Sequence, residues 1–181
     1  MITLKNAISP EDSFEVEKAI SYLVINYNKS GNNPKPVILH SLRVAELLLE
    51  MGYSKKIIIG AILHDILEDT KVTSKKLKLK FGEEILSLVK SVSYNNSITD
   101  PIHLYKEMFD RVVSHGKEAV VLKAVDIAVN SLYINLVPEY KKRERLIEKG
   151  RYFLDFTKEF SNEPAWQLLK IRNQKCAKEL L

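Results

Sequence analysis

The segment LHDILEDT, residues 63–70, places an imidazole, three carboxylates and a hydroxyl directly after an apolar run. His64 and Glu68 are four residues apart, so on a helix they share one side. The same spacing joins Asp65 to Asp69 in an adjacent column. Burying these groups is costly unless they are paired or coordinated. The pattern predicts that His64 and Asp65 bind one metal ion, while the carboxylates one turn later act on a bound water.

Two residues elsewhere in the sequence complete a ligand set. A His-Asp pair alone is common, and a lone buried histidine is more often a core residue than a ligand. His40, however, opens the preceding helical stretch, and Asp126 ends the apolar run VVLKAVD. Two imidazoles and two carboxylates suit manganese, iron or zinc rather than calcium. An ion held this way lowers the pKa of its water and neutralises phosphoryl oxygens, which indicates a metal-dependent hydrolase.

The elements that must position these residues are helices. The sequence holds only 6 Gly and 6 Pro, and we find no convincing period-two alternation, internal repeat or linker. The predicted fold class is therefore all-α, a single compact helical bundle over residues 1–181. The expected helices cover about 14–27, 40–51, 55–67, 74–92, 102–114, 118–136 and 163–181, with a further charged helix from about 140.

Local signals set the predicted helix ends and faces. Ser13 or Asp12 can cap the first helix, with Phe14 on or near its buried face. Gly52 is a natural residue to end the second helix. The third helix is apolar nearly all round, so it belongs in the centre of the domain. The last helix is expected to pack through an apolar face that includes Ile171.

The bulk composition is that of an ordinary globular protein, with 45% hydrophobic and 28% charged residues and a formal net charge of +5. A single cysteine excludes an internal disulfide framework. The apolar stretch 57–63 is far shorter than the roughly 20 residues that a bilayer requires. The first residues of the sequence lack the basic and then apolar pattern that is typical of a secretory signal. Two runs are rich in basic residues, 75–80 and 141–145, and acidic residues lie near both, which favours solvated helix faces. We expect a cytoplasmic protein with no membrane or nucleic-acid partner.

The ordered pattern H…HD…D resembles the HD superfamily of metal-dependent phosphohydrolases. Within it, the chain most resembles the hydrolase domain of the RelA/SpoT homologues and their small stand-alone relatives, which remove pyrophosphate from (p)ppGpp. Residues 35–45, 61–70 and 123–130 resemble the family patterns EPYIxHPxxVA, ALLHDxxEDT and KLADRxxN, and residues 81–92 resemble its intervening helix. The resemblance covers about residues 20–137, and it implies a single HD-domain helical bundle with C-terminal helices over 140–181.

The resemblance also implies a role for each matching residue. The divalent metal, typically Mn²⁺ with Fe²⁺ or Zn²⁺ as alternatives, would be bound by His40, His64, Asp65 and Asp126. The attacking water would be positioned and activated by Glu68 and Asp69. The nucleotide would be contacted by Asn130. Three basic residues are further candidates for binding substrate phosphates: Arg43, Lys29 and Lys123. For Arg43 and Lys123 a solvated or structural role is as plausible.

Four positions depart from the family pattern. Val37 stands where the family usually has Tyr, and Gly31 falls near the position of an Arg, for which Lys29 is the nearest substitute. Ile127 replaces an Arg and Tyr133 replaces a Thr. The metal and water residues are all present, so the departures point to an altered nucleotide pocket.

The leading hypothesis is a guanosine-3′,5′-bis(diphosphate) 3′-pyrophosphohydrolase, which acts on a small phosphorylated nucleotide. A nearby alternative keeps the chemistry and changes the substrate to another nucleotide or phosphoester. A hypothesis from a different class is a non-catalytic nucleotide-binding regulator. A purely structural helical domain is the least favoured, because it leaves the buried acids and imidazoles without partners.

Overall fold

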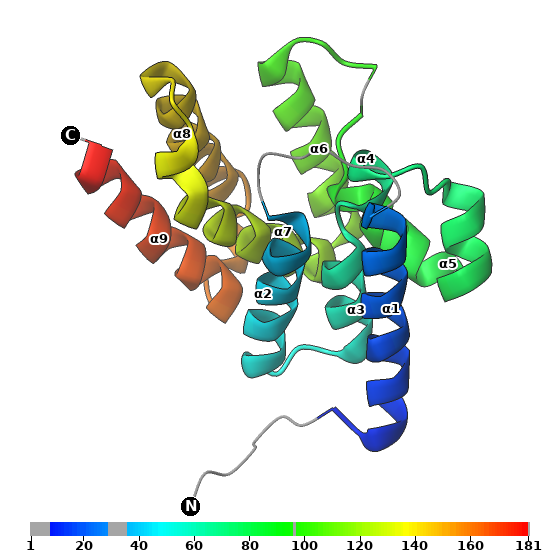
Figure 1. The fold of residues 1–181 in the computed structure, drawn as a ribbon. Helices are drawn as coiled ribbons and strands as arrows, with labels where there is room; N and C mark the ends of the chain where they lie inside the picture. Colours follow the sequence, from blue (N-terminus) through cyan, green and yellow to red (C-terminus); the bar gives the residue numbers. More distant parts are fainter. Residues whose placement is uncertain (1–7, 29–35, 96, 181) are drawn as a thin grey trace, which may run out of the picture. The chain divides into compact units, whose positions relative to one another are not determined.

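The computed structural model describes residues 8–28, 36–95 and 97–180, and within them it shows helices and no strand (Figure 1). The predicted all-α class is confirmed. The chain divides into two compact units, Met1–Tyr94 and Asn95–Leu181, and a single domain over the whole chain stays a prediction. The first unit holds α1 (Pro10–Asn28), α2 (Val37–Glu50), α3 (Lys55–Leu63), α4 (Ile66–Asp69) and α5 (Ser74–Val92). The second holds α6 (Pro101–His115), α7 (Lys117–Asn130), η1 (Ser131–Leu136), α8 (Tyr140–Phe156), η2 (Lys158–Phe160) and α9 (Pro164–Leu180).

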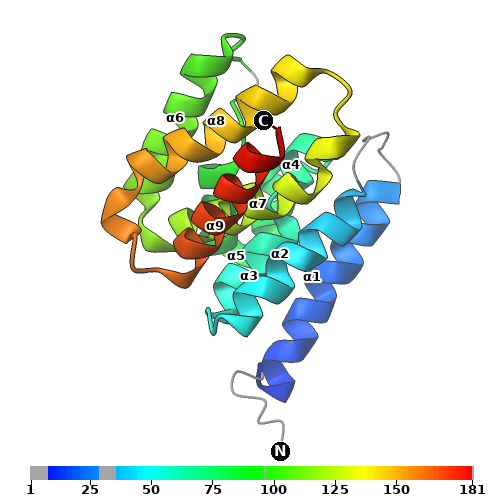
Figure 2. The same cartoon turned by 90° about the vertical axis from the view of Figure 1, so that its left-hand side faces the viewer.

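Helix α3 is the centre of the first unit, as its all-round apolar sequence predicts. Every residue from Ile57 to Leu63 is buried. The helix packs against α1, α2 and α5, and Figures 1 and 2 show α1 and α2 running alongside it. A helix that is buried on all sides fixes the position of whatever follows its last turn, which here is the dipeptide His64-Asp65.

Helix α1 begins earlier than the sequence signals indicate. The Ser9 hydroxyl accepts a hydrogen bond from the backbone N–H of Asp12 at 3.1 Å, so Ser9 rather than Ser13 caps the helix. Pro10 then occupies the first turn, where its missing N–H costs nothing. Ser13 lies inside the helix and its hydroxyl donates to the Ser9 carbonyl at 2.9 Å.

The face that α1 turns inward carries the buried residues Ala19 and Leu23. Asp12 and Glu15 bind the ammonium of Lys55 on α3, at 2.8 and 2.9 Å. Phe14 lies between these two acids in sequence and therefore projects from the other side of the helix, where it is 73% exposed. The prediction that Phe14 lies on the buried face was wrong.

The predicted continuous third helix is interrupted at its chemical end. His64 Nδ1 donates to the Ala61 carbonyl at 2.7 Å. In an unbroken α-helix that carbonyl would accept from the N–H of Asp65, so the imidazole competes with the helical ladder. Helix α3 ends at Leu63, and the short helix α4 starts at Ile66.

Helix α5 is bent at a glycine. Thr73 caps its start by accepting from the N–H of Lys76 at 3.4 Å. Gly82 has φ of 86° and ψ of 174° inside the helix. Only glycine adopts this backbone conformation without steric cost, so Gly82 divides α5 into two segments.

Replacing Gly82 with alanine is expected to lower the free energy of unfolding by about 1–2 kcal/mol. A Cβ at this position would meet nothing within 4 Å, so the cost is that of the positive φ alone. Urea unfolding followed by circular dichroism measures the change. Glu84→Ala, at an exposed position in the same helix, should stay within about 0.5 kcal/mol of the wild type. Equal stability of the two variants would mean that the bend is absent in solution.

Helix α7 is the centre of the second unit. Every residue from Ala119 to Val129 is buried, and α7 packs against α6, α8, α9 and η1. Within the described residues, the stretch Lys117–Leu136 is long and apolar enough to cross a membrane, with a mean hydropathy of 1.5, yet 67% of it is buried inside the protein. This composition is also that of a core helix, and the sequence analysis considered only the shorter stretch 57–63.

The last helix packs through fewer apolar residues than predicted. Trp166 and Leu169 of α9 are buried, at 7% and 1% exposure. Ile171 is 62% exposed, so the prediction that it packs inward was wrong. The residue lies two positions after Leu169, and on a helix such neighbours point in different directions.

The single cysteine of the sequence is buried in this last helix. Cys176 is 8% exposed and its thiol lies 3.9 Å from the Ser131 carbonyl of η1. Its core neighbours come from η1 and α8, and partly buried side chains of α8 and α9 pack against the same cluster: Ile134, Ile147, Leu146 and Ala177.

Candidate metal centre

Three of the predicted metal ligands meet in the first unit. His40 lies one turn inside α2, and His64 and Asp65 connect α3 to α4. The two imidazole Nε2 atoms are 3.3 Å apart. Asp65 Oδ1 lies 3.1 Å from His64 Nε2, and its Oδ2 lies 4.0 Å from His40 Nε2. All three side chains are buried, and their ligand atoms lie within 4.8 Å of one another.

The spacing of this cluster fits a shared ion. Two ligand atoms that each lie at about 2.1 Å from one ion are separated by roughly 3.0–3.4 Å when adjacent and by up to about 4.2 Å when opposite. The observed 3.1, 3.3 and 4.0 Å fall in this range. His64 Nδ1 carries its proton toward the Ala61 carbonyl, which leaves Nε2 with a lone pair toward the cluster. These residues therefore form a candidate divalent-metal site.

The two predicted water-activating carboxylates lie beside this cluster in sequence, on α4. Glu68 and Asp69 are half-buried, and their backbone N–H groups donate to the Asp65 carbonyl at 3.1 and 2.9 Å. The Glu68 side chain has a partner in the segment that follows α5: its Oε1 accepts from the backbone N–H of Tyr94 at 3.0 Å. Glu68 is thus held from the end of α5, while the main chain of α4 is anchored on Asp65.

Asp126 belongs to the second unit, where two side chains of its own helix hold it. Lys123 Nζ lies 2.9 Å from Asp126 Oδ2, and each of the two side chains is 3% exposed. Asn130 Nδ2 donates to Asp126 Oδ1 at 2.6 Å. The i,i+3 and i,i+4 spacings bring the three residues onto one face of α7. Lys123 and Asn130, both predicted as substrate contacts, bind Asp126 here.

Replacing Lys123 with methionine is expected to destabilise the protein by about 3–5 kcal/mol, because a buried carboxylate then loses its ion pair. Lys117→Met is the matched control, since that lysine is 58% exposed and pairs with Glu163 at 2.7 Å. The control should cost less than about 1 kcal/mol. Urea unfolding measures both changes, and equal stabilities would show that the buried pair gives no net stabilisation.

The remaining predicted contacts are spread over both units. Arg43 is half-buried on α2, one turn after His40, and Lys29 lies outside the described residues, as does Gly31. Of the positions that depart from the family pattern, three are described. They are buried or half-buried: Val37 on α2, Ile127 on α7 and Tyr133 in η1.

The groups that orient the side chains of His64 and Glu68 were not predicted from the sequence. The Ala61 carbonyl sets the tautomer of His64, and the Tyr94 N–H holds Glu68. Ser93, at the end of α5, is buried with its hydroxyl 2.8 Å from the Val89 carbonyl. Two of these groups are backbone atoms, so no side-chain pattern in the sequence signals them.

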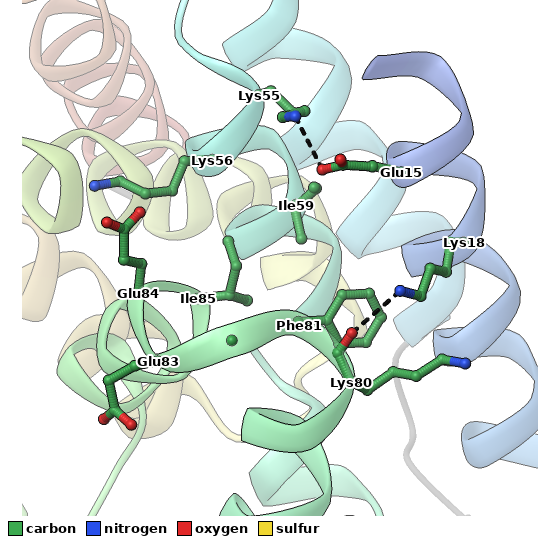
Figure 3. Close-up of a pocket in the computed structure, with 11 residues that line it drawn as sticks. Glu15, Lys18, Lys55, Lys56, Ile59, Lys80, Phe81, Glu83, Glu84 and Ile85 are labelled. Atoms are coloured by element: carbon green, nitrogen blue, oxygen red, sulfur yellow. Dashed lines mark hydrogen bonds and ion pairs between the residues drawn. The ribbon is translucent and has the colours of Figure 1, made fainter. Parts of the chain in front are cut away.

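A charged groove of about 510 Å³ also lies in the first unit, beside the bend of α5 (Figure 3). Hydrogen bonds with the Asp12 and Glu15 carboxylates raise the pKa of Lys55 at its rim. Lys18 Nζ donates to the Lys80 carbonyl at 3.2 Å. These contacts join α1 to α3 and α5, and the groove shares no lining residue with the metal cluster.

Known protein families and curated proteins include sequences similar to this chain. The HD domain family model matches residues 19–112, just over half of the 181 residues. A guanosine-3′,5′-bis(diphosphate) 3′-pyrophosphohydrolase from Aquifex aeolicus (strain VF5) is 35% identical over 85 residues, which is 46% of this chain and 12% of that protein. A protein of the same name from Borreliella burgdorferi is 28% identical over 149 residues, 77% of this chain and 22% of that protein. The chain thus spans less than a quarter of the length of these curated relatives.

Two solved structures share the fold. A metazoan ortholog of SpoT that hydrolyzes ppGpp superposes with a TM-score of 0.76 and 17% identity, covering 97% of this chain and 100% of the other. The crystal structure of lmo0812 from Listeria monocytogenes EGD-e gives a TM-score of 0.65 and 19% identity, covering 82% of this chain and 98% of the other. At these identities the likeness concerns the fold.

Proposed function

Because the chain belongs to the HD domain family, we propose that it is a metal-dependent phosphohydrolase that releases pyrophosphate from guanosine 3′,5′-bis(diphosphate). The observation that carries the proposal is the buried cluster of His40, His64 and Asp65, with ligand atoms spaced for one ion. The names of the Aquifex and Borreliella relatives supply the substrate.

In this proposal the metal ligands are His40, His64, Asp65 and Asp126, and the preferred ion is Mn²⁺, with Fe²⁺ or Zn²⁺ as alternatives. When bound, such an ion polarises phosphoryl oxygens and lowers the pKa of a coordinated water. The protein contributes a buried site in which each neutral imidazole offers a nitrogen lone pair to the ion. For His64 the hydrogen bond to the Ala61 carbonyl supports that tautomer.

Glu68 is assigned the role of general base in this reaction. Its carboxylate takes a proton from the attacking water as the water oxygen bonds to the phosphorus on the ribose 3′-oxygen. The bond from phosphorus to that 3′-oxygen breaks, the 3′-oxygen takes up the proton that Glu68 removed from the water, and pyrophosphate leaves. Asp69, on the same short helix, is proposed to orient the water. The proposed substrate contacts remain Asn130, Arg43, Lys29 and Lys123. Asn130 and Lys123 both bind Asp126 in the structure.

A second candidate keeps this chemistry and changes the base or the phosphoester. The observation that favours it is the set of departures at Val37, Ile127 and Tyr133, since each replaces a residue type that the family pattern carries. The side chains of Val37 and Ile127 are apolar and buried, at 2% and 7% exposure. Neither side chain therefore offers a polar group to a nucleotide. The relatives' substrate is therefore the first compound to test and not the only one.

The test measures pyrophosphate and phosphate release from (p)ppGpp and from a panel of nucleoside phosphates, with added Mn²⁺ and with chelator. Pyrophosphate release from (p)ppGpp above all other compounds supports the proposal. Faster turnover of another nucleotide would replace the substrate and keep the metal chemistry. Nucleotide binding without turnover, with or without metal, would favour a regulatory module.

A further inference from the structure

The end of helix α5 is built around a buried serine. Ser93 is 6% exposed and has an extended backbone, with φ of −80° and ψ of 152°. Its hydroxyl donates to the Val89 carbonyl at 2.8 Å and lies 3.5 Å from the His64 carbonyl. Its own N–H donates to Val89 at 3.1 Å. These contacts fix the point at which the chain leaves α5. That point lies beside the main chain of His64, one of the three residues of the metal cluster.

Fixing that exit point sets the direction of the next peptide group. The N–H of Tyr94 donates to Glu68 Oε1 at 3.0 Å, although the two residues are 26 positions apart in the chain. Glu68 sits on α4, a helix of one turn, and its own backbone N–H donates to the Asp65 carbonyl at 3.1 Å. A backbone N–H directly after the fixed end of a helix is a rigid partner for a carboxylate, because it loses little rotational freedom on binding.

We infer that the backbone N–H of Tyr94 is a positioning group that orients the Glu68 carboxylate for proton transfer. The inference rests on the proposed function, because it assigns Glu68 the role of general base. It adds the C-terminal end of α5 to the catalytic apparatus, at a residue whose side chain need not touch the substrate. Ser93 supports this group by holding the exit from α5.

The experiment compares Tyr94→Pro with Tyr94→Ala. Both remove the aromatic side chain, but only proline removes the N–H. Ser93 already has the extended backbone that a following proline requires, so the change suits the local chain. Relative to Tyr94→Ala, Tyr94→Pro is expected to lower kcat about 10–100-fold, with KM and Mn²⁺ affinity changed less than about threefold. Equal kcat values for the two variants would overturn the inference while leaving the hydrolase proposal standing.

Two further comparisons separate positioning from a general structural effect. In a Glu68→Gln background the proline variant should lose little more activity, since both changes act on one interaction. A full additive loss would indicate structural damage instead. Ser91 is the matched control for Ser93, because it is equally buried and its hydroxyl donates to the Leu88 carbonyl of the same helix at 2.6 Å. Ser93→Ala should reduce kcat several-fold, whereas Ser91→Ala should stay within about twofold of the wild type.

A readout without turnover keeps the two proposals distinguishable. Amide hydrogen exchange should show the Tyr94 N–H protected in the wild type and exchanging faster in Glu68→Ala. If exchange is equally fast in both proteins, the hydrogen bond does not form and the inference fails whatever the activity. If the amide is protected but the wild type hydrolyses no phosphorylated nucleotide, the proposed function fails and the positioning role for catalysis fails with it.

Discussion

Replacing Asp65 with alanine is expected to reduce pyrophosphate release from (p)ppGpp to the background of the assay. Asp65 supplies the only carboxylate of the three-residue cluster in the first unit, so the variant leaves two neutral imidazoles for a dication. A saturating metal stabilises a folded protein in proportion to its affinity, by about 2.7 kcal/mol at one hundred times the Kd. Added Mn²⁺ should therefore raise the melting temperature of the wild type and have little effect on the variant.

The matched control for this variant is Asp110→Ala, which removes an exposed aspartate from α6. The control should keep its activity and its thermal response to Mn²⁺. An Asp65→Ala protein that still hydrolyses (p)ppGpp at the wild-type rate would reject the metal centre. Loss of activity with an intact response to Mn²⁺ would instead move Asp65 from metal ligand to a role toward substrate or water.

Replacing Glu68 with glutamine is expected to lower kcat by about 10²–10⁴-fold, the usual contribution of a general base. Glutamine is nearly isosteric and its Oε1 still accepts a hydrogen bond, so the contact with the Tyr94 N–H is preserved. What is lost is the capacity to take a proton. Steady-state kinetics should show the change in kcat, while the effect of Mn²⁺ on melting temperature stays as in the wild type.

Asp69→Asn is the comparison that distinguishes the two neighbouring acids. Both residues lie on α4 and are half-buried. If Asp69→Asn costs more activity than Glu68→Gln, the proton-transfer role belongs to Asp69 and Glu68 takes the orienting role. If neither change lowers kcat by tenfold, water activation depends on a group outside this helix.

Much of the fold could be predicted because the central helices have mostly apolar sequences. Helix α3 is apolar on nearly every side and α7 is apolar over most of its surface, and such helices are buried in globular proteins. The end of α2 was also predictable: Gly52 has φ of 80°, a conformation that glycine adopts readily and that ends helices. Of the candidate site, His64 and Asp65 were predictable because an imidazole and a carboxylate at the end of a buried helix need a partner.

The features that were not predicted depend on particular hydrogen bonds and ion pairs, some local and some between residues far apart in the sequence. The end of α3 is set by the His64 side chain bonding to the Ala61 carbonyl, a choice that helical periodicity does not contain. Phe14 is exposed because α1 packs through the opposite side, and that packing depends on residues more than forty positions later, including Lys55. The hold on Glu68 comes from a main-chain N–H, and every residue but proline offers one.

The burial of Cys176 gives this protein an internal reporter. Because the sequence contains no other cysteine, a thiol reagent can react at one place, and it does so only when α9 moves away from η1 and α8. The labelling rate in native conditions therefore measures the free energy of that opening. A value equal to the free energy of global unfolding would mean that residues 1–181 unfold together, as a single domain should. A smaller value would identify α9, or the second unit as a whole, as a separately opening part of the chain.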